Sequence, residues 1–174
     1  MSEKLIKIEE FDNYSIYKFS PDVFHLFGKF YPERINVRRI IRFLLALKDG
    51  YEIYSLVYNN IAIAYCTIQN GKCRRFDYTT EKDIVVGPYV VMPQYRGLGL
   101  AKELISRVLK YKGKGYSFAY AYITEGNLAS VKTCEKLGFE FYKYAYVTRF
   151  KADVKATDDK DAGHIIMRLK LGDG

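Results

Sequence analysis

The sequence contains few of the residues that build disulfide frameworks and metal sites. Its three cysteines, Cys66, Cys73 and Cys134, have neither the even pairing of a disulfide scaffold nor the close clustering of zinc ligands. Only two histidines, His25 and His164, are present to complete such a cluster. We therefore expect reduced cysteines and no bound metal.

The sequence also lacks a long apolar run, an internal repeat, a low-complexity tract and a linker. No window approaches the roughly 18 consecutive apolar residues of a membrane span. The first residues, MSEKLIKIEEF, include acids where a secretory leader has basic and then apolar residues. Apolar residues make up 49% and charged residues 28% of the 174 residues, which is typical of a globular protein. We expect a soluble, cytoplasmic protein without a membrane partner, folded as one domain over residues 1–174.

An excess of basic residues favours an anionic partner. The chain has 28 Lys and Arg against 20 Asp and Glu, a formal charge of +8. This charge is compatible with a nucleic acid, an acidic membrane surface or a phosphorylated cofactor. Tyr142, Tyr144 and Tyr146 alternate along one predicted strand and are compatible with a stacking platform for single-stranded nucleic acid. In a sheet flanked by helices, however, such residues more often line a core or a groove.

Hydrophobic periodicity predicts an α/β protein with a mixed sheet. The nearly unbroken apolar run Ile84–Met92 is typical of a strand that is buried on both faces. Asn59 and Asn60 separate two β-rich runs and predict a hairpin. Segments 70–83 and 151–163 are polar and are predicted to be loops. The predicted strands cover residues 14–19, 52–58, 61–69, 84–92, 116–122, 139–150 and 164–171. Four helices are predicted: one that begins at Ser20-Pro21-Asp22, one over 40–47, one over 101–108 and one that begins at Asn127.

The stretch PQYRGLGLAKEL, from Pro93 to Leu104, places Gly97 and Gly99 directly after the buried strand. Their spacing lacks the third glycine of a dinucleotide-binding fingerprint and the Gly-Lys-Ser/Thr end of a P-loop. What remains is a strand, a turn without side chains at two positions, and an amphipathic helix. Exposed backbone N–H groups at a helix start bind a pyrophosphate without a metal. The alternative is a tight turn whose glycines serve its conformation only.

Two motifs resemble those of the GNAT N-acetyltransferase family. Val91–Ala101 is similar to the family's coenzyme A pyrophosphate loop, in which Gln or Arg is followed by two residues, Gly, one residue, and Gly or Ala; Gln94, Gly97 and Gly99 match this pattern. The second motif is an Asn that opens a helix ending in Glu-Lys-Leu-Gly-Phe, and Asn127–Phe139 reproduces it. The resemblance implies a GNAT-like mixed, mostly antiparallel central sheet flanked by helices on both faces, as a single acyl-CoA N-acyltransferase-like domain.

The resemblance also implies that acetyl-CoA is the cosubstrate. Its pantetheine would run beside the fourth predicted strand, since a linear amide chain can pair with an exposed strand edge. The alternative for Lys132 is that it is an ordinary surface lysine without a role in binding. The implied coenzyme-binding residues are Val91, Met92, Arg96, Gly97, Leu98, Gly99, Leu100, Ala101, Asn127, Ser130 and Lys132.

Family members transfer an acetyl group directly from a thioester to a primary amine. The resemblance implies that the Val91 N–H stabilises the oxyanion, where the family's fourth strand usually bulges, and places Tyr89 near the reaction centre. Family members commonly carry a Tyr, aimed at the coenzyme sulfur, directly before the Glu-Lys-Leu-Gly-Phe run; here that residue is Cys134. A thiol can supply a proton, so Cys134 is a candidate acid. Its alternative role is core packing beside Val131 and Leu137.

The sequence names neither a general base nor an acceptor. Ile84–Met92 contains no carboxylate or histidine, Glu52 and Glu125 are the nearest strand-associated acids, and deprotonation through water is equally compatible. The acceptor, a small-molecule or protein amine, would enter between 22–48 and 151–163. Neither segment carries the signature of a substrate class, and the positive charge mildly favours an acidic acceptor.

An N-acetyltransferase is therefore the predicted function. A non-catalytic acyl-CoA-binding sensor is the first alternative, because Cys134 replaces the usual acid. A nucleic-acid-binding module is the second, although no nucleic acid is expected as a partner. A homodimer is compatible with the sequence.

Overall fold

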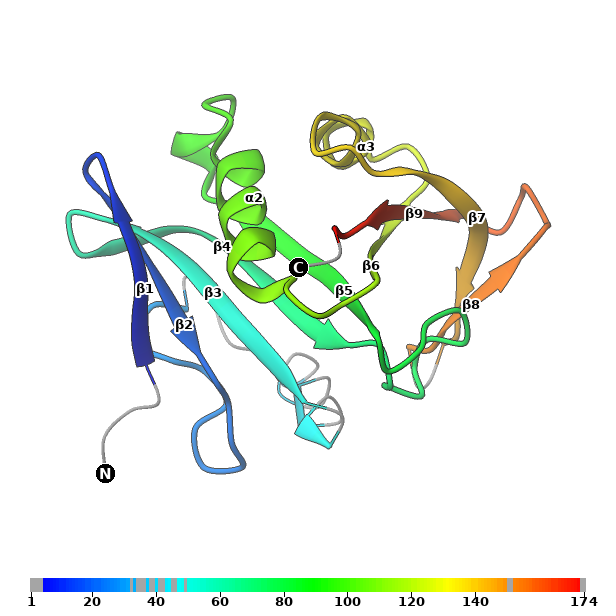
Figure 1. The fold of residues 1–174 in the computed structure, drawn as a ribbon, viewed down its shortest axis with the longest axis horizontal. Coiled ribbons are helices and arrows are strands. Elements are labelled where there is room, and N and C mark those ends of the chain that lie inside the picture. Colours follow the sequence, from blue (N-terminus) through cyan, green and yellow to red (C-terminus); the bar gives the residue numbers. More distant parts are fainter. Residues whose placement is uncertain are drawn as a thin grey trace.

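One sheet organises the chain. The computed structural model describes residues 5–31, 33, 37, 40, 43–44, 47–48, 50–149 and 152–172. Its strands are β1 (Leu5–Phe11), β2 (Tyr14–Phe19), β3 (Tyr51–Tyr58), β4 (Ile61–Asn70), β5 (Asp83–Val91), β6 (Phe118–Thr124), β7 (Glu140–Val147), β8 (Val154–Thr157) and β9 (His164–Lys170). Within the described residues they form one nine-stranded sheet in the order β1-β2-β3-β4-β5-β6-β9-β7-β8 (Figure 1). Neighbouring strands are antiparallel except β5 and β6, which are parallel.

Two helices pack on one face of this sheet. They are α2 (Leu100–Lys112) and α3 (Leu128–Lys136), and a short 3₁₀ turn, η1 (Pro93–Tyr95), precedes α2. The predicted apolar stripe of α2 is buried, because Leu104, Ile105 and Val108 pack in one cluster with Ile84 and Val86 of β5. Figure 1 shows α2 crossing in front of the central strands and α3 beside β6 and β9. Among the described residues, no helix is long and apolar enough to cross a membrane.

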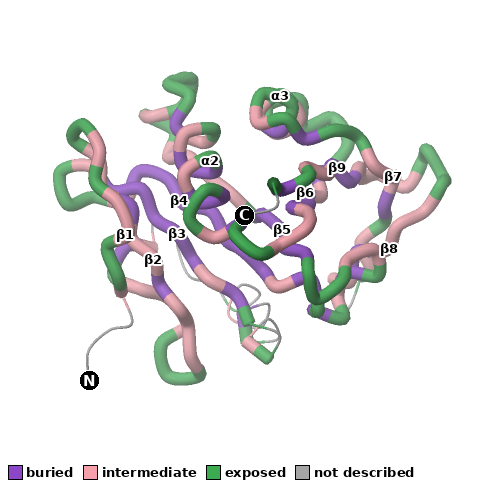
Figure 2. Tube along the Cα trace, viewed as in Figure 1, coloured by how far each residue is buried: buried purple, intermediate pink, exposed green. Residues whose placement is uncertain are grey.

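The opposite face has its own apolar clusters. Phe43 lies in helical conformation and packs with Phe19, Ile53 and Tyr65. The predicted helix over 40–47 is thus present at its described residues. Figure 2 shows that burial is concentrated in β3, β4 and β5, as expected for central strands covered on both sides. The predicted fold class, a mixed and mostly antiparallel sheet with helices against it, is confirmed.

The central strands β5 and β6 pair over a short length and then separate. Their register contains three pairs, between Asp83–Val85 and Phe118–Tyr120. Beyond these pairs, β5 continues along β4 and β6 continues along β9. The sheet therefore opens between its two central strands, directly before the glycine-rich turn.

A bulge in β5 decides which side chains face the helices. The β4–β5 register shifts between Val86 and Tyr89, where Gly87 and a proline add a residue to the strand. Proline has no N–H to donate to a neighbouring strand, so it is tolerated at such a bulge. Because one extra residue reverses the side-chain alternation, Tyr89 and Val91 lie on the same face as Val86. The bulge thus turns Tyr89 toward α3.

Several local predictions were wrong, and one was confirmed. Residues 20–31 contain bends and turns instead of a helix, because Asp22 Oδ1 accepts from the N–H of Phe24 and His25 in an isolated capped turn. The edge strand β1 was not predicted, and β8 lies inside the predicted loop 151–163. The hairpin between β3 and β4 is confirmed, with Asn59 and Asn60 at φ of 47° and 63°.

Candidate active site

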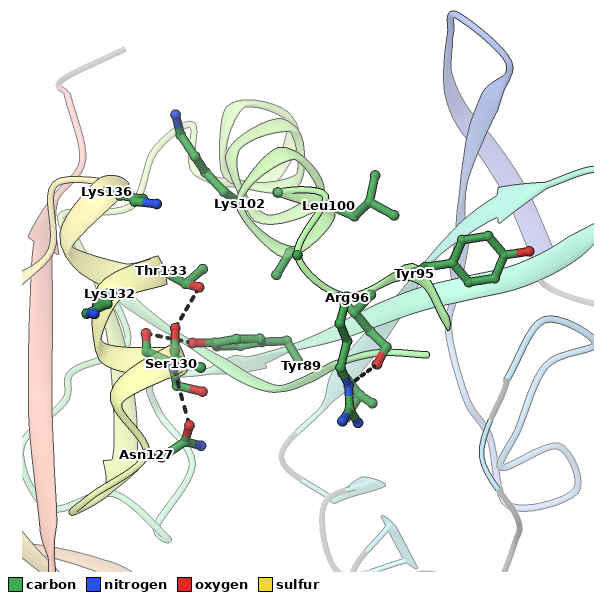
Figure 3. A pocket seen from close by; sticks show the side chains of 16 residues that line it. Tyr89, Tyr95, Arg96, Leu100, Lys102, Asn127, Ser130, Lys132, Thr133 and Lys136 are labelled. Carbon is green, nitrogen blue, oxygen red and sulfur yellow. Dashed lines mark hydrogen bonds between the residues drawn. The ribbon is translucent and has the colours of Figure 1, made fainter. Parts of the chain in front are cut away.

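A groove of about 640 Å³ lies over the end of β5, between the start of α2 and the side of α3 (Figure 3). Most of the predicted coenzyme-binding residues line it. Met92 and Leu98 are the exceptions, and the Leu98 side chain is 65% exposed. The lining residues are Tyr89, Val90, Val91, Tyr95, Arg96, Gly97, Gly99, Leu100, Ala101, Lys102, Asn127, Ala129, Ser130, Lys132, Thr133 and Lys136.

The start of α2 presents backbone N–H groups to this groove. Gly97 and Gly99 have φ of 81° and 75°, a left-handed conformation that residues with a Cβ rarely adopt. The helix begins with the bond from Glu103 N–H to Gly99 O at 3.1 Å, and no side chain caps it. The N–H groups of the first turn, Leu100–Lys102, therefore have no acceptor within the helix. Together with the helix dipole, they make a site suited to a phosphate group.

Basic side chains surround this helix start. Lys102 comes from α2, and Lys132 and Lys136 come from α3 on the other side of the groove (Figure 3). Arg96 is folded back on the strand, where its Nε donates to Val91 O at 3.2 Å. Sequence reasoning missed Lys102 and Lys136. The four-residue spacing of Lys132 and Lys136, which places both on one helix face, is the signal that could have found the second of them.

The edge of β5 is open beside the groove. Neighbouring N–H groups of a strand point to opposite edges. Met92 N–H donates to Ile63 O of β4 at 2.8 Å, so Val91 N–H points toward the other edge, where β5 is no longer paired with β6. The expected bulge is not at Val91 but earlier, at Gly87. The Val91 amide nevertheless has the orientation that an oxyanion donor in the groove requires.

Tyr89 reaches from β5 across the floor of the groove to α3 (Figure 3). Its hydroxyl donates to Ser130 O at 3.1 Å and lies 3.7 Å from Cys134 Sγ. Burial is the main cause that raises the pKa of Tyr89, and the neighbouring thiol adds to it. The phenol is therefore protonated at physiological pH.

Cys134 lies behind Tyr89 and not in the groove. Its side chain is only 1% exposed and belongs to the apolar cluster under α2 and α3. Burial raises the pKa of the Cys134 thiol, so the thiol stays protonated at neutral pH, but its position behind Tyr89 keeps it from contacting a ligand in the groove. Its polar contact is the Tyr89 hydroxyl. The thiol thus adjoins the candidate reaction site through Tyr89.

Asn127 holds the start of α3 at the other wall of the groove. Its Oδ1 accepts from Ser130 N–H at 3.3 Å, which is the predicted cap of this helix. The side-chain amide group still has two N–H donors for a ligand. Asn127 and Ser130 therefore form the cap of α3 and also line the groove.

Comparison with known proteins identifies the family. The model of the acetyltransferase (GNAT) family matches residues 20–139. The chain belongs to the GNAT acetyltransferase family. This family uses acetyl-CoA, which agrees with the chemistry of the groove. A search of curated protein sequences found no match.

Solved structures of acetyltransferases share this GNAT fold at low sequence identity. The ribosomal-protein-S18-alanine N-acetyltransferase from Escherichia coli is 16% identical with a TM-score of 0.61, over 91% of this chain and 96% of that one. The IAA acetyltransferase from Bacillus cereus is 14% identical with a TM-score of 0.60, over 90% and 100% of the two chains. The yncA protein from Salmonella typhimurium, solved with its cofactor acetyl-CoA, is 22% identical with a TM-score of 0.55, over 82% and 78%.

A second cavity of about 150 Å³ lies where β5 and β6 of this GNAT fold separate. Tyr89, Asn127 and Ser130 line both this cavity and the larger groove. Tyr122 and Thr124 of β6 add hydroxyl groups to its wall. The opening in the sheet thus provides a second approach to Tyr89, separate from the groove.

The two acids that the sequence suggested for this GNAT protein lie elsewhere. Glu52 accepts hydrogen bonds from Tyr54 and Lys112 and pairs with Lys18 at 2.7 Å, and it lines neither the groove nor the second cavity. Glu125 is exposed and also lines neither of them.

An imidazole lies beside the wall of the second cavity. His164 Nε2 is 3.4 Å from the Thr124 hydroxyl, which belongs to the cavity wall. The register of β6 with β9 brings this pair together, so no local sequence pattern reveals it. Among the described residues, no group of three or more His, Cys, Asp or Glu side chains could hold a metal ion.

Proposed function

We propose that this protein is an N-acetyltransferase that transfers an acetyl group from acetyl-CoA directly to a primary amine of a small molecule or protein. One observation carries the proposal. The groove aligns a phosphate-binding helix start, an open strand edge at Val91 and the protonated phenol of Tyr89 along one surface. The same phenol faces the opening between β5 and β6, through which an acceptor can approach.

The donor groups of the groove fit acetyl-CoA, which supplies the activated acetyl thioester. The first N–H groups of α2 bind the pyrophosphate, because a diphosphate prefers backbone donors at a helix start. Lys102, Lys132 and Lys136 add charge-assisted bonds to the phosphates. The open edge at Val91 and the side-chain amide of Asn127 bind the pantetheine amides.

Two groups of the chain act on the reacting atoms. The Val91 N–H donates to the carbonyl oxygen as negative charge develops there. The amine nitrogen forms the new C–N bond and releases its extra proton to water. As the C–S bond breaks, the Tyr89 hydroxyl gives its proton to the sulfur, and the phenol is then reprotonated from water. Tyr89 thus takes the role of the acid, and Cys134 positions its hydroxyl.

The proposal is tested by calorimetry with acetyl-CoA and by thiol release over a panel of primary amines. We expect binding, with thiol release that depends on an amine. Replacing Lys132 and Lys136 together by Ala should weaken acetyl-CoA binding about tenfold, and more at low salt. Replacing the exposed Lys170 of β9 by Ala is the matched control and should leave binding unchanged.

The alternatives predict different results in these two measurements. Binding of acetyl-CoA without transfer to any amine of the panel would favour the acyl-CoA sensor. Failure to bind acetyl-CoA would contradict both the acetyltransferase and the acyl-CoA sensor.

A further inference from the structure

Arg75, in the loop between β4 and β5, is a half-buried cation without a carboxylate partner among the described residues. Its Nε donates to Ala152 O at 2.7 Å, its Nη2 to the Tyr122 hydroxyl at 3.0 Å and its Nη1 to Gln69 Oε1 at 3.3 Å. All three acceptors are neutral. Since a guanidinium carries five N–H donors, Arg75 retains both its charge and donors for a further ligand.

The Arg75 guanidinium lies where the sheet opens. Gln69 belongs to β4 and Tyr122 to β6, so the side chain spans β5, which lies between them. Gln69 Nε2 also donates to Gly87 O in the bulge of β5 at 3.0 Å. The pairing of β5 with β6 ends just before this bulge. Arg75 therefore bridges the two halves of the sheet at the point where they part.

This position is on the face opposite the coenzyme groove. Tyr122 packs in the cluster of Phe76, whereas its neighbour Ile123 packs in the cluster under α2 and α3. Tyr122 also lines the 150 Å³ cavity, whose wall includes Tyr89. Arg75 does not line this cavity itself, but it adjoins the cavity wall through its hydrogen bond to the Tyr122 hydroxyl.

The surroundings of Arg75 hold the guanidinium in one orientation. The rings of Phe76 and Tyr122 lie 5.4 Å and 5.9 Å from its central carbon, in addition to the three hydrogen bonds. Partial burial of a charge without an opposite charge costs free energy, which an anionic ligand would offset. A planar guanidinium that is already oriented binds carboxylates and phosphates through paired N–H donors.

We propose that Arg75 binds an anionic group of the acceptor, so that the preferred acceptor is a small amine that also carries a carboxylate or a phosphate. The inference rests on the proposed acetyl transfer at Tyr89 and adds the chemical class of the acceptor. Arg75 is then a specificity-determining residue that acts from the face opposite the coenzyme.

The test compares matched amines that differ in one anionic group: β-alanine with β-alaninamide, and phosphoethanolamine with ethanolamine. Thiol release gives kcat and KM for each amine with the unmodified protein, Arg75→Gln and Arg75→Lys. Arg74→Gln is the matched control, because it removes the same charge from the neighbouring, exposed position. Calorimetry with acetyl-CoA checks that each variant keeps its coenzyme site.

We expect kcat/KM to be about 10- to 100-fold higher for the anionic member of at least one pair, the range of a charge-assisted hydrogen bond. Arg75→Gln should abolish this preference through KM, while rates with the neutral amines change less than about threefold. Arg75→Lys should keep part of the preference. If Arg75→Gln does not fold, a reduced preference in Arg75→Lys tests the inference in its place. Which pair shows the preference distinguishes a carboxylate from a phosphate.

Equal use of both members of each pair, or a preference that survives Arg75→Gln, would overturn the inference and leave acetyl transfer standing. If no amine releases thiol, the proposed function fails separately. The anion site at Arg75 is then tested by the melting temperature of the protein in saturating coenzyme A, with and without each amine. The anionic amine should then stabilise the unmodified protein more than its neutral partner, and Arg75→Gln should remove the difference. The absence of such a difference overturns the anion site.

Discussion

Replacing Tyr89 by Phe removes one oxygen from the proposed reaction site and leaves the ring in place. The lost hydroxyl donates to Ser130 O at 3.1 Å and adjoins Cys134 Sγ. Loss of one such bond costs about 0.5–1.5 kcal/mol of stability. Loss of a positioned proton donor lowers turnover by about 10²- to 10⁴-fold, or about 3–5.5 kcal/mol in the barrier. The catalytic effect should therefore exceed the structural one clearly.

The assay is thiol release with saturating acetyl-CoA from pH 6 to about pH 9.5, paired with calorimetry and urea unfolding. Burial raises the pKa of Tyr89 above its ordinary value, so the phenol stays protonated over this whole range. We expect the rate of the unmodified protein to rise with pH as the acceptor amine loses its proton, without a fall at the alkaline end. Tyr89→Phe should lower the rate by a similar factor at every pH.

Tyr146→Phe, at a position 49% exposed on β7, provides the matched control for the loss of a phenol. It should leave kcat and acetyl-CoA affinity unchanged. The reasoning about Tyr89 is refuted if Tyr89→Phe keeps kcat within about threefold of the unmodified protein while it binds acetyl-CoA normally.

Three further changes separate the roles of neighbouring groups. Cys134→Ala should keep most of the turnover but cost about 1–3 kcal/mol in urea unfolding, because the buried thiol packs and does not donate; a turnover loss as large as that of Tyr89→Phe would contradict this. Gly99→Val should weaken acetyl-CoA binding at least tenfold by calorimetry, because a β-branched residue at φ of 75° strains the turn by about 1–3 kcal/mol; unchanged affinity would exclude this turn from the site. Glu52→Gln should cost about 1–2 kcal/mol at pH 7 in urea unfolding. Burial alone would raise the pKa of Glu52, but bonds from Lys18, Tyr54 and Lys112 outweigh it and lower that pKa, so the carboxylate stabilises the fold above its unfolded pKa of about 4.3. This contribution disappears as pH falls through the lower folded pKa, and a stability difference that persisted at low pH would contradict the assignment.

The sequence predicted well the elements whose signals are local. The strand-turn-helix around Gly97 and Gly99, the Asn127 cap and the hairpin at Asn59 all depend on residues within a few positions of one another. The glycine turn and the Asn127 cap also line the groove that we propose for acetyl-CoA. Local sequence signals were therefore sufficient to predict most of the residues that line this groove.

Edge strands and capped turns were mispredicted because their local signals are ambiguous. The strand β1 carries Lys7, Glu9 and Glu10, so it resembles a polar loop until its pairing with β2 is known. Asp22 has the chemistry of a helix cap, but that chemistry stabilises an isolated turn equally well. Pairing with β2 decided the first case, and in the second the hydrogen bonds of Asp22 stop at His25 without a following helix.

The side that we propose for the acceptor could not be predicted, because it is made by contacts between distant segments. Gln69, Arg75 and Tyr122 come from two strands and a loop, and only the sheet order brings them together. His164 and Thr124 likewise meet only through the register of β6 with β9. A single sequence carries no signal for such pairs.

The bulge in β5 links the two sides of the site. Strict alternation from Val86 would place Tyr89 on the face of Arg75, away from the coenzyme groove. Gly87 and Pro88 add one residue, and Tyr89 instead points to α3, where its hydroxyl reaches Cys134. The position that usually carries the family's tyrosine is thus filled by a small thiol, and the space beside it is filled by a phenol from the strand. The bulge and the small residue on α3 therefore depend on each other, since a tyrosine at position 134 would compete with Tyr89 for the same volume.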